Sequence, residues 1–124
     1  MSRRKPVVLL ALLPIAAACP ARAGDLPVRV GQCVMTAIKE VRTRLDTPGS
    51  GSAVSFEKGG TQVGYETVPA IEHSRPGDRV RMCLVSVPKN CPKGDERGRV
   101  YRTTNLRTHQ SWTMPDSAHM CGGA

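Results

Sequence analysis

Residues 30–45, VGQCVMTAIKEVRTRL, place apolar side chains at the spacing of an α-helix. Six of them share one face: Val30, Val34, Ala37, Ile38, Val41 and Leu45. Lysine, glutamate and arginine occupy positions off this face, as is typical of an amphipathic helix that packs on one side. The pattern therefore predicts an N-terminal helix, which the following DTPGSGS ends.

The next segment, SAVSFEKGGTQVGYETV at residues 52–68, predicts a β-hairpin. Its two adjacent glycines suit a two-residue turn between antiparallel strands. Such a turn would set Phe56 opposite Val63 and Val54 opposite Tyr65 on one face of the hairpin. Local turn chemistry and cross-strand pairing thus favour the same structure.

The remaining pattern predicts further strands. Residues 69–78, PAIEHSRPGD, form a loop with a turn at its Pro-Gly pair, and residues 79–87, RVRMCLVSV, are apolar on both faces like a central strand. Residues 98–114 can fold back near Leu106 and Arg107, setting Tyr101 opposite Trp112. The predicted fold class is α+β, with one N-terminal amphipathic helix packed on an antiparallel sheet of about five strands.

The first residues have the features of an export signal. MSRRKP is basic, residues 7–18 are apolar but too short to span a bilayer, and Ala21 and Ala23 form an A-x-A cleavage signal. We therefore predict a signal peptide at 1–23 and a single small disulfide-stabilised domain at 24–124, in the periplasm or secreted. In the alternative, Cys19 is acylated and anchors a membrane-bound lipoprotein.

Charge and composition narrow the classes of partner. The formal net charge of +8 falls to +4 without the basic residues of the leader: Arg3, Arg4, Lys5 and Arg22. A mildly cationic domain favours an acidic protein or an anionic envelope component. It lacks the dense basic stripe of a nucleic-acid binder, and we predict no nucleic-acid partner. After the leader no apolar run is long enough to cross a membrane.

The predicted domain contains four cysteines: Cys33, Cys83, Cys91 and Cys121. An even number in a small exported domain predicts two disulfides. Seven residues separate Cys83 from Cys91, unlike the C-x-x-C spacing of a redox dithiol. Local geometry favours Cys33 with Cys83 and Cys91 with Cys121. The alternative joins Cys83 to Cys91 and Cys33 to Cys121.

Side chains near the C-terminus suggest two alternative chemistries. Met114, His119 and Met120 carry thioether and imidazole groups that suit copper, which would make the chain a periplasmic metal-binding protein. Asp116, Ser117 and His119 combine an acid, a hydroxyl and a base, as a small envelope hydrolase would require. Catalytic triads are usually gathered from distant segments, and short polar residues such as Asp116 and Ser117 are typical of turns. We predict no enzyme activity, cofactor or metal.

The segment at residues 88–99, PKNCPKGDERGR, supports the leading hypothesis. Two prolines and a disulfide at its cysteine would hold this loop stiff, which reduces the entropy lost on docking. We predict an exported noncatalytic binding protein, either a hydrolase inhibitor or an envelope-associated module. Its predicted partner-binding residues are the cations of this loop: Lys89, Lys93, Arg97 and Arg99.

Overall fold

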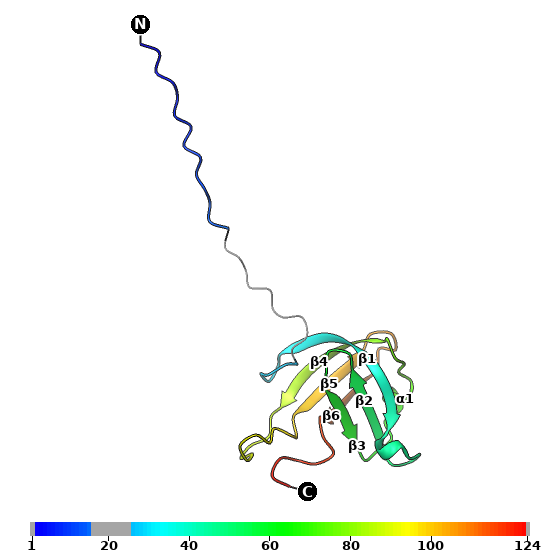
Figure 1. Ribbon diagram of the computed structural model, residues 1–124. Coiled ribbons are helices and arrows are strands. Elements are labelled where there is room, and N and C mark those ends of the chain that lie inside the picture. Colours follow the sequence, from blue (N-terminus) through cyan, green and yellow to red (C-terminus); the bar gives the residue numbers. More distant parts are fainter. Residues whose placement is uncertain (1, 16–25, 124) are drawn as a thin grey trace.

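The computed structural model describes residues 2–15 and 26–123 of the chain. Residues 2–15 are exposed and contain no helix or strand, while the folded part begins after them (Figure 1). The predicted cleavage signal at Ala21 and Ala23, and the alternative lipid anchor at Cys19, lie outside the described residues. Within the described ranges, no helix has the length and apolar character needed to cross a bilayer.

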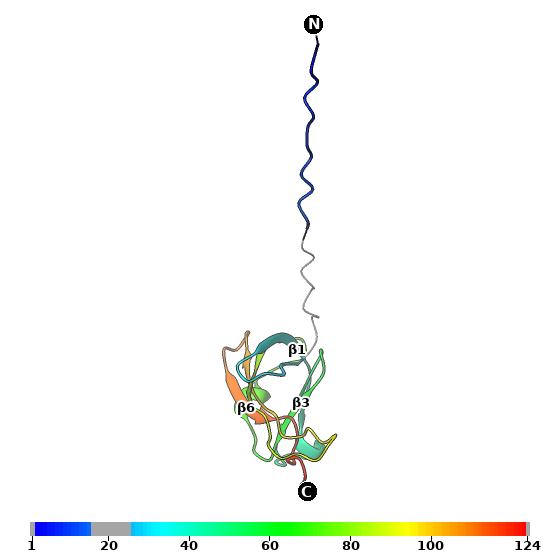
Figure 2. The same ribbon diagram turned by 90° about the vertical axis from the view of Figure 1, so that its left-hand side faces the viewer.

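The folded part is a single antiparallel sheet, curled into a half-barrel (Figure 1 and Figure 2). Its six strands have the spatial order β3-β2-β1-β4-β5-β6, and β3 contacts β6 across the curl. The strands are β1 (Cys33–Thr43), β2 (Ser52–Phe56), β3 (Thr61–Gly64), β4 (Arg79–Ser86), β5 (Val100–Asn105) and β6 (Ser111–Pro115). Helical structure in the described residues is limited to α1 (Pro69–Glu72) and the 3-10 turn η1 (Arg44–Asp46). The predicted antiparallel sheet is therefore confirmed.

The predicted N-terminal helix over residues 30–45 is wrong, because this segment forms the long strand β1. Alternate side chains from Val34 to Ile38 face the interior, and a bulge after Ile38 then returns Val41 to the same side. A bulge adds one residue to a strand and so interrupts its two-residue alternation. Val34, Ile38 and Val41 consequently have helical spacing in the sequence although they lie on a strand. The fold is mostly β, not α+β with a packed helix.

The β2–β3 hairpin is present, but its predicted register is wrong. Val54 pairs with Gln62 and not with Tyr65. The amide of Phe56 donates to the carbonyl of Gly60 (3.2 Å), so the turn encloses the residues between them and is longer than predicted. As a result Gln62 is fully buried, whereas the side chain expected to face inward, Tyr65, is 56% exposed.

The β5–β6 hairpin is also present with a shifted register. Tyr101 pairs with Met114, and Trp112 pairs with Thr103, so the predicted Tyr101–Trp112 pair does not form. A shift of two residues keeps each side chain on its original face. Tyr101 and Trp112 therefore both stay buried, as the apolar pattern requires. The predicted central strand is confirmed, since β4 lies between β1 and β5.

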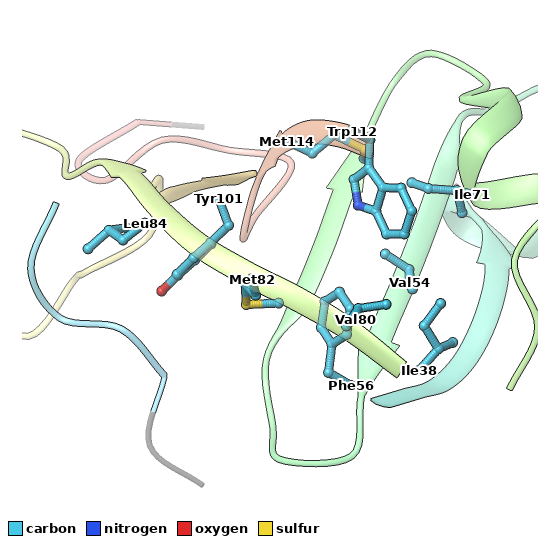
Figure 3. Packing of buried hydrophobic residues seen from close by; sticks show 10 residues of the cluster. All are labelled: Ile38, Val54, Phe56, Ile71, Val80, Met82, Leu84, Tyr101, Trp112 and Met114. Atoms are coloured by element: carbon cyan, nitrogen blue, oxygen red, sulfur yellow. The ribbon is translucent and has the colours of Figure 1, made fainter. Parts of the chain in front are cut away.

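Apolar side chains from five strands and α1 fill the inner side of the curled sheet (Figure 3). This core consists of Ile38, Val54, Phe56, Ile71, Val80, Met82, Leu84, Tyr101, Trp112 and Met114. The core therefore joins both halves of the sheet order, since β2 and β6 each contribute two of these side chains.

Gln62 is a polar residue inside this core, with all of its hydrogen-bonding capacity used. Its Nε2 donates to the carbonyls of Tyr101 (2.8 Å) and Met114 (2.9 Å). Its Oε1 accepts from Thr103 Oγ1 (2.7 Å) and Trp112 Nε1 (2.8 Å). The side chain of Gln62 thus links β3 to β5 and β6 across the open side of the half-barrel.

A second polar network holds the β5–β6 turn against the start of β4. The carboxylate of Asp78 accepts from Arg107 Nε (2.7 Å), Asn105 Nδ2 (2.9 Å) and the Arg75 amide (2.9 Å). Arg107 also donates to the carbonyl of His73 (2.8 Å). Hydrogen bonding from Arg107 holds the pKa of Asp78 well below its ordinary value of 3.8, although burial acts in the opposite direction.

We expect this carboxylate to make the protein sensitive to acid. Because the folded-state pKa of Asp78 is depressed, its stabilisation is fully present above the unfolded value of 3.8 and is lost as the pH falls toward the folded value. Asp78→Asn should lower the free energy of unfolding at neutral pH by about 2 kcal/mol and flatten the decline in acid. Thermal melts between about pH 2 and about pH 7 measure both effects.

The control for this experiment is Asp46→Asn, which removes an exposed carboxylate that pairs with Arg42 (2.8 Å). Exposed pairs of this kind contribute little to stability. The role assigned to Asp78 would be contradicted if its variant and the control declined equally with acid.

Candidate functional site

The loop at residues 87–99 joins β4 to β5 and contains all the predicted partner-binding residues. A disulfide from Cys91 to Cys121, with Cα atoms 5.3 Å apart, ties this loop to the C-terminal tail at residues 116–123. Figure 1 and Figure 2 show both segments at the same end of the half-barrel. The other disulfide joins Cys33 of β1 to Cys83 of β4, directly across the sheet. These two disulfides are the pairing that was favoured from the sequence, and the alternative pairing does not form.

Asp95 provides a second link between the loop and the tail. Its carboxylate accepts from Arg97 Nε and Nη2, both at 2.9 Å, and from the amide of Gly122 at 2.9 Å. The amide of Cys121 in turn donates to the carbonyl of Arg97 (2.9 Å). Hydrogen bonding from Arg97 lowers the pKa of Asp95 well below its usual range. These hydrogen bonds hold Arg97 and the tail amide of Gly122 against the same carboxylate.

The four predicted cations of the loop fall into two groups. Arg97 pairs with Asp95, which also bonds to the tail. Arg99 lies 3.3 Å from Glu96, and its side chain is only 26% exposed. Lys89 and Lys93 are exposed, and neither has an ion pair with another residue that the structure describes. The lysines are therefore available to a partner, whereas the arginines mainly shape the loop.

A hollow of about 290 Å³ opens in this loop, and its lining includes the sequence neighbours of Lys89 and Lys93 but not the lysines themselves. It is lined by Val87, Pro88, Cys91, Pro92, Gly94, Asp95, Glu96 and Arg99. These residues give it an apolar wall of valine and proline, and its charged part consists of Asp95 and the Glu96–Arg99 ion pair. The sulfur of Cys91 in this lining is oxidised, and the carboxylates of Asp95 and Glu96 are each paired with an arginine.

The residues considered for copper are placed in different environments. Met114 belongs to the core and is 6% exposed, while His119 and Met120 are exposed on the tail. Cys121 is oxidised and offers no thiolate. In the part of the chain that the structure describes, no group of three or more histidine, cysteine, aspartate or glutamate side chains is arranged to hold a metal ion.

The residues considered for hydrolysis bond to local backbone. Asp116 Oδ1 accepts from the amide of Gly98 (2.8 Å), and Ser117 Oγ accepts from the amide of His119 (3.2 Å). Between described residues there is no hydrogen bond from the Ser117 hydroxyl to the His119 imidazole. Asp116 adds a further tie between the loop and the segment that follows β6.

Sequence analysis missed a second group of cations, which lies on the outer face of the sheet. Arg79, Arg81 and Arg102 are all exposed, and they belong to the adjacent strands β4 and β5. The signal was present in the alternation Arg-Val-Arg-Met at the start of β4, where the valine and the methionine are buried. On a strand, that alternation directs the arginines outward.

Comparison of the chain with known proteins gave no match among protein-family models, curated proteins or solved structures.

Proposed function

We propose that the protein is an exported, noncatalytic binding protein that engages an acidic protein partner through the loop at residues 87–99. The observation that carries this proposal is the brace on the loop, made by the Cys91–Cys121 disulfide and the Asp95–Arg97 pair. A loop held in one conformation before docking loses less entropy when it binds. Two disulfides are compatible with export to an oxidising compartment.

The surface of the loop indicates the chemistry of this partner. Lys89 and Lys93 are exposed and are sequence neighbours of residues that line the hollow, and Val87 in its lining is 43% exposed. An acidic segment with an apolar anchor would satisfy both features, since the lysines attract its carboxylates and the hollow receives its side chain. An inhibited hydrolase and an envelope scaffold are two kinds of partner that meet this description.

Replacement of both loop lysines tests the proposal. We expect Lys89→Ala with Lys93→Ala to weaken binding to a partner recovered from envelope extract by about tenfold, and to reduce the salt dependence of binding. Titration of the purified partner at two salt concentrations provides the measurement.

Lys39→Ala with Lys58→Ala is the matched control, because it removes two exposed lysines that lie on β1 and on the β2–β3 turn. This control should bind as the unchanged protein does. Equal affinities for the two double variants would show that the loop lysines do not form the binding site.

A further inference from the structure

The outer face of β4, β5 and β6 is cationic, and these three strands include no aspartate or glutamate. Glu57, from the turn between β2 and β3, lines a hollow together with Arg79 but forms no ion pair with it. Arg79, Arg81 and Arg102 project from it, while the residues between them, such as Val80 and Tyr101, are buried on the other side. We call the surface formed by these three arginines the arginine face.

The spacing of the arginines follows from the sheet register. Arg79 and Arg81 occupy alternate positions of β4, about 7 Å apart along the strand. Arg102 pairs with Cys83 across the sheet and is therefore a diagonal neighbour of Arg81, again at roughly 7 Å. None of the three forms an ion pair with another described residue. Their like charges repel, and several separate anionic groups at a similar spacing would relieve this repulsion.

Hydroxyl groups accompany these cations. Arg81 pairs with Thr104 of β5, and Arg102 pairs with Thr113 of β6. The Thr104 hydroxyl is 2.8 Å from that of Ser111, so both lie on the same outer face. Guanidinium and hydroxyl donors together form a surface suited to phosphate oxygens.

Exposed valines lie near the end of β4. Val85 occupies the bulge between Leu84 and Ser86 and is 44% exposed. The amide of Gly31 donates to the carbonyl of Leu84 (2.9 Å), which brings residues 28–31 alongside the end of this strand. Val28 and Val30 in that segment are 64% and 60% exposed. Exposed valines therefore lie close to the end of β4 that follows Arg79 and Arg81.

We propose that this outer sheet surface docks on an anionic phospholipid bilayer. The arginines would contact headgroup phosphates, and the valines would enter the boundary between headgroups and acyl chains, which is the usual division of roles in interfacial binding. A nucleic acid fits less well, because single strands stack on exposed aromatic rings and the aromatic side chains of these strands, Tyr101 and Trp112, are buried. This inference does not depend on the loop at residues 87–99.

Vesicle co-sedimentation tests the inference with the protein purified after export. We expect it to bind vesicles of phosphatidylcholine with roughly 30% phosphatidylglycerol, and not vesicles of phosphatidylcholine alone. Replacing Arg79, Arg81 and Arg102 by glutamine should weaken binding about a hundredfold, and high salt should weaken binding of the unchanged protein similarly. Because all three side chains are exposed, the variant is expected to keep the fold, which circular dichroism checks.

The matched control replaces Lys39, Arg42 and Arg75 by glutamine, which removes the same charge from exposed positions on β1 and on the turn before β4, and it should bind vesicles as the unchanged protein does. Equal vesicle binding by the variant of the arginine face and this control would overturn the inference. So would tighter binding to a single-stranded oligonucleotide than to vesicles at equal phosphate concentration, since that result would favour nucleic acid. Loss of vesicle binding by the variant of the arginine face with intact partner binding would separate this surface from the loop.

Discussion

Reduction of both disulfides is expected to unfold most of the protein at physiological temperature. The bridges span sequence separations of 50 and 30 residues, for Cys33–Cys83 and Cys91–Cys121 respectively. On the chain-entropy model, loops of these lengths contribute about 4 kcal/mol each. The total free energy of unfolding of a domain is typically about 5 to 15 kcal/mol, so losing both bridges removes a large share of it. Urea unfolding with and without reductant gives the measurement.

Paired cysteine-to-serine variants distinguish the contributions of the two bridges. Cys33 and Cys83 are on strands that are already paired, so their replacement should lower the melting temperature of the whole sheet. Cys91 and Cys121 hold a loop and a tail outside the strands, so their replacement should also expose both segments to proteases and weaken partner binding. An unchanged melt in reductant would contradict a stabilising role for either bridge.

The features that the sequence predicts correctly are those decided locally. Cysteine number and an exported context are sufficient to predict two disulfides, and adjacent glycines are sufficient to predict the β2–β3 hairpin. Register is harder, because it depends on how many residues the turn encloses. The turn between Phe56 and Gly60 is longer than the predicted two-residue turn. This difference places Gln62 in the interior, where Tyr65 was predicted to lie.

The helix prediction failed because of tertiary context. Val34, Ile38 and Val41 fit an amphipathic helix, and the bulge that gives them this spacing on β1 forms only when β2 pairs beside it. β-branched residues along the segment favour a strand, but this preference is weak and depends on context. Periodicity alone therefore cannot distinguish a bulged strand from a helix.

The structure of the loop at residues 87–99 could be anticipated from the sequence only in part, for a similar reason. The prolines and cysteine of the loop indicate a brace, but its partners on the tail are distant in sequence. Asp95 pairs with Arg97, which makes this arginine less available to a partner, and it also accepts from the amide of Gly122. The contact with Gly122 could not be predicted without knowing that the Cys91–Cys121 bridge brings the loop and the tail together. The arginine face likewise requires knowing that β5 lies next to β4.

Among single substitutions, the largest loss of stability is expected from Gln62→Leu. Leucine has a similar size, but it removes every hydrogen bond that links β3 to β5 and β6. Trp112 Nε1 and Thr103 Oγ1 would then lie in the core without an acceptor, and each unsatisfied buried group costs about 1 to 3 kcal/mol. We expect the free energy of unfolding to fall by about 3 to 5 kcal/mol in urea titrations.

Two comparisons identify the cause of that loss. Gln32→Leu changes an exposed glutamine whose Oε1 accepts from the amide of Val28 (3.1 Å), and it should have little effect. The triple variant that adds Thr103→Val and Trp112→Phe to Gln62→Leu lacks the two donors that Gln62→Leu leaves unpaired. It should recover part of the lost free energy of unfolding, because fewer buried polar groups remain without a partner. If Gln62→Leu instead matched Gln32→Leu, apolar packing between β3 and β6 would suffice to close the half-barrel, and the buried amide would add nothing to its stability.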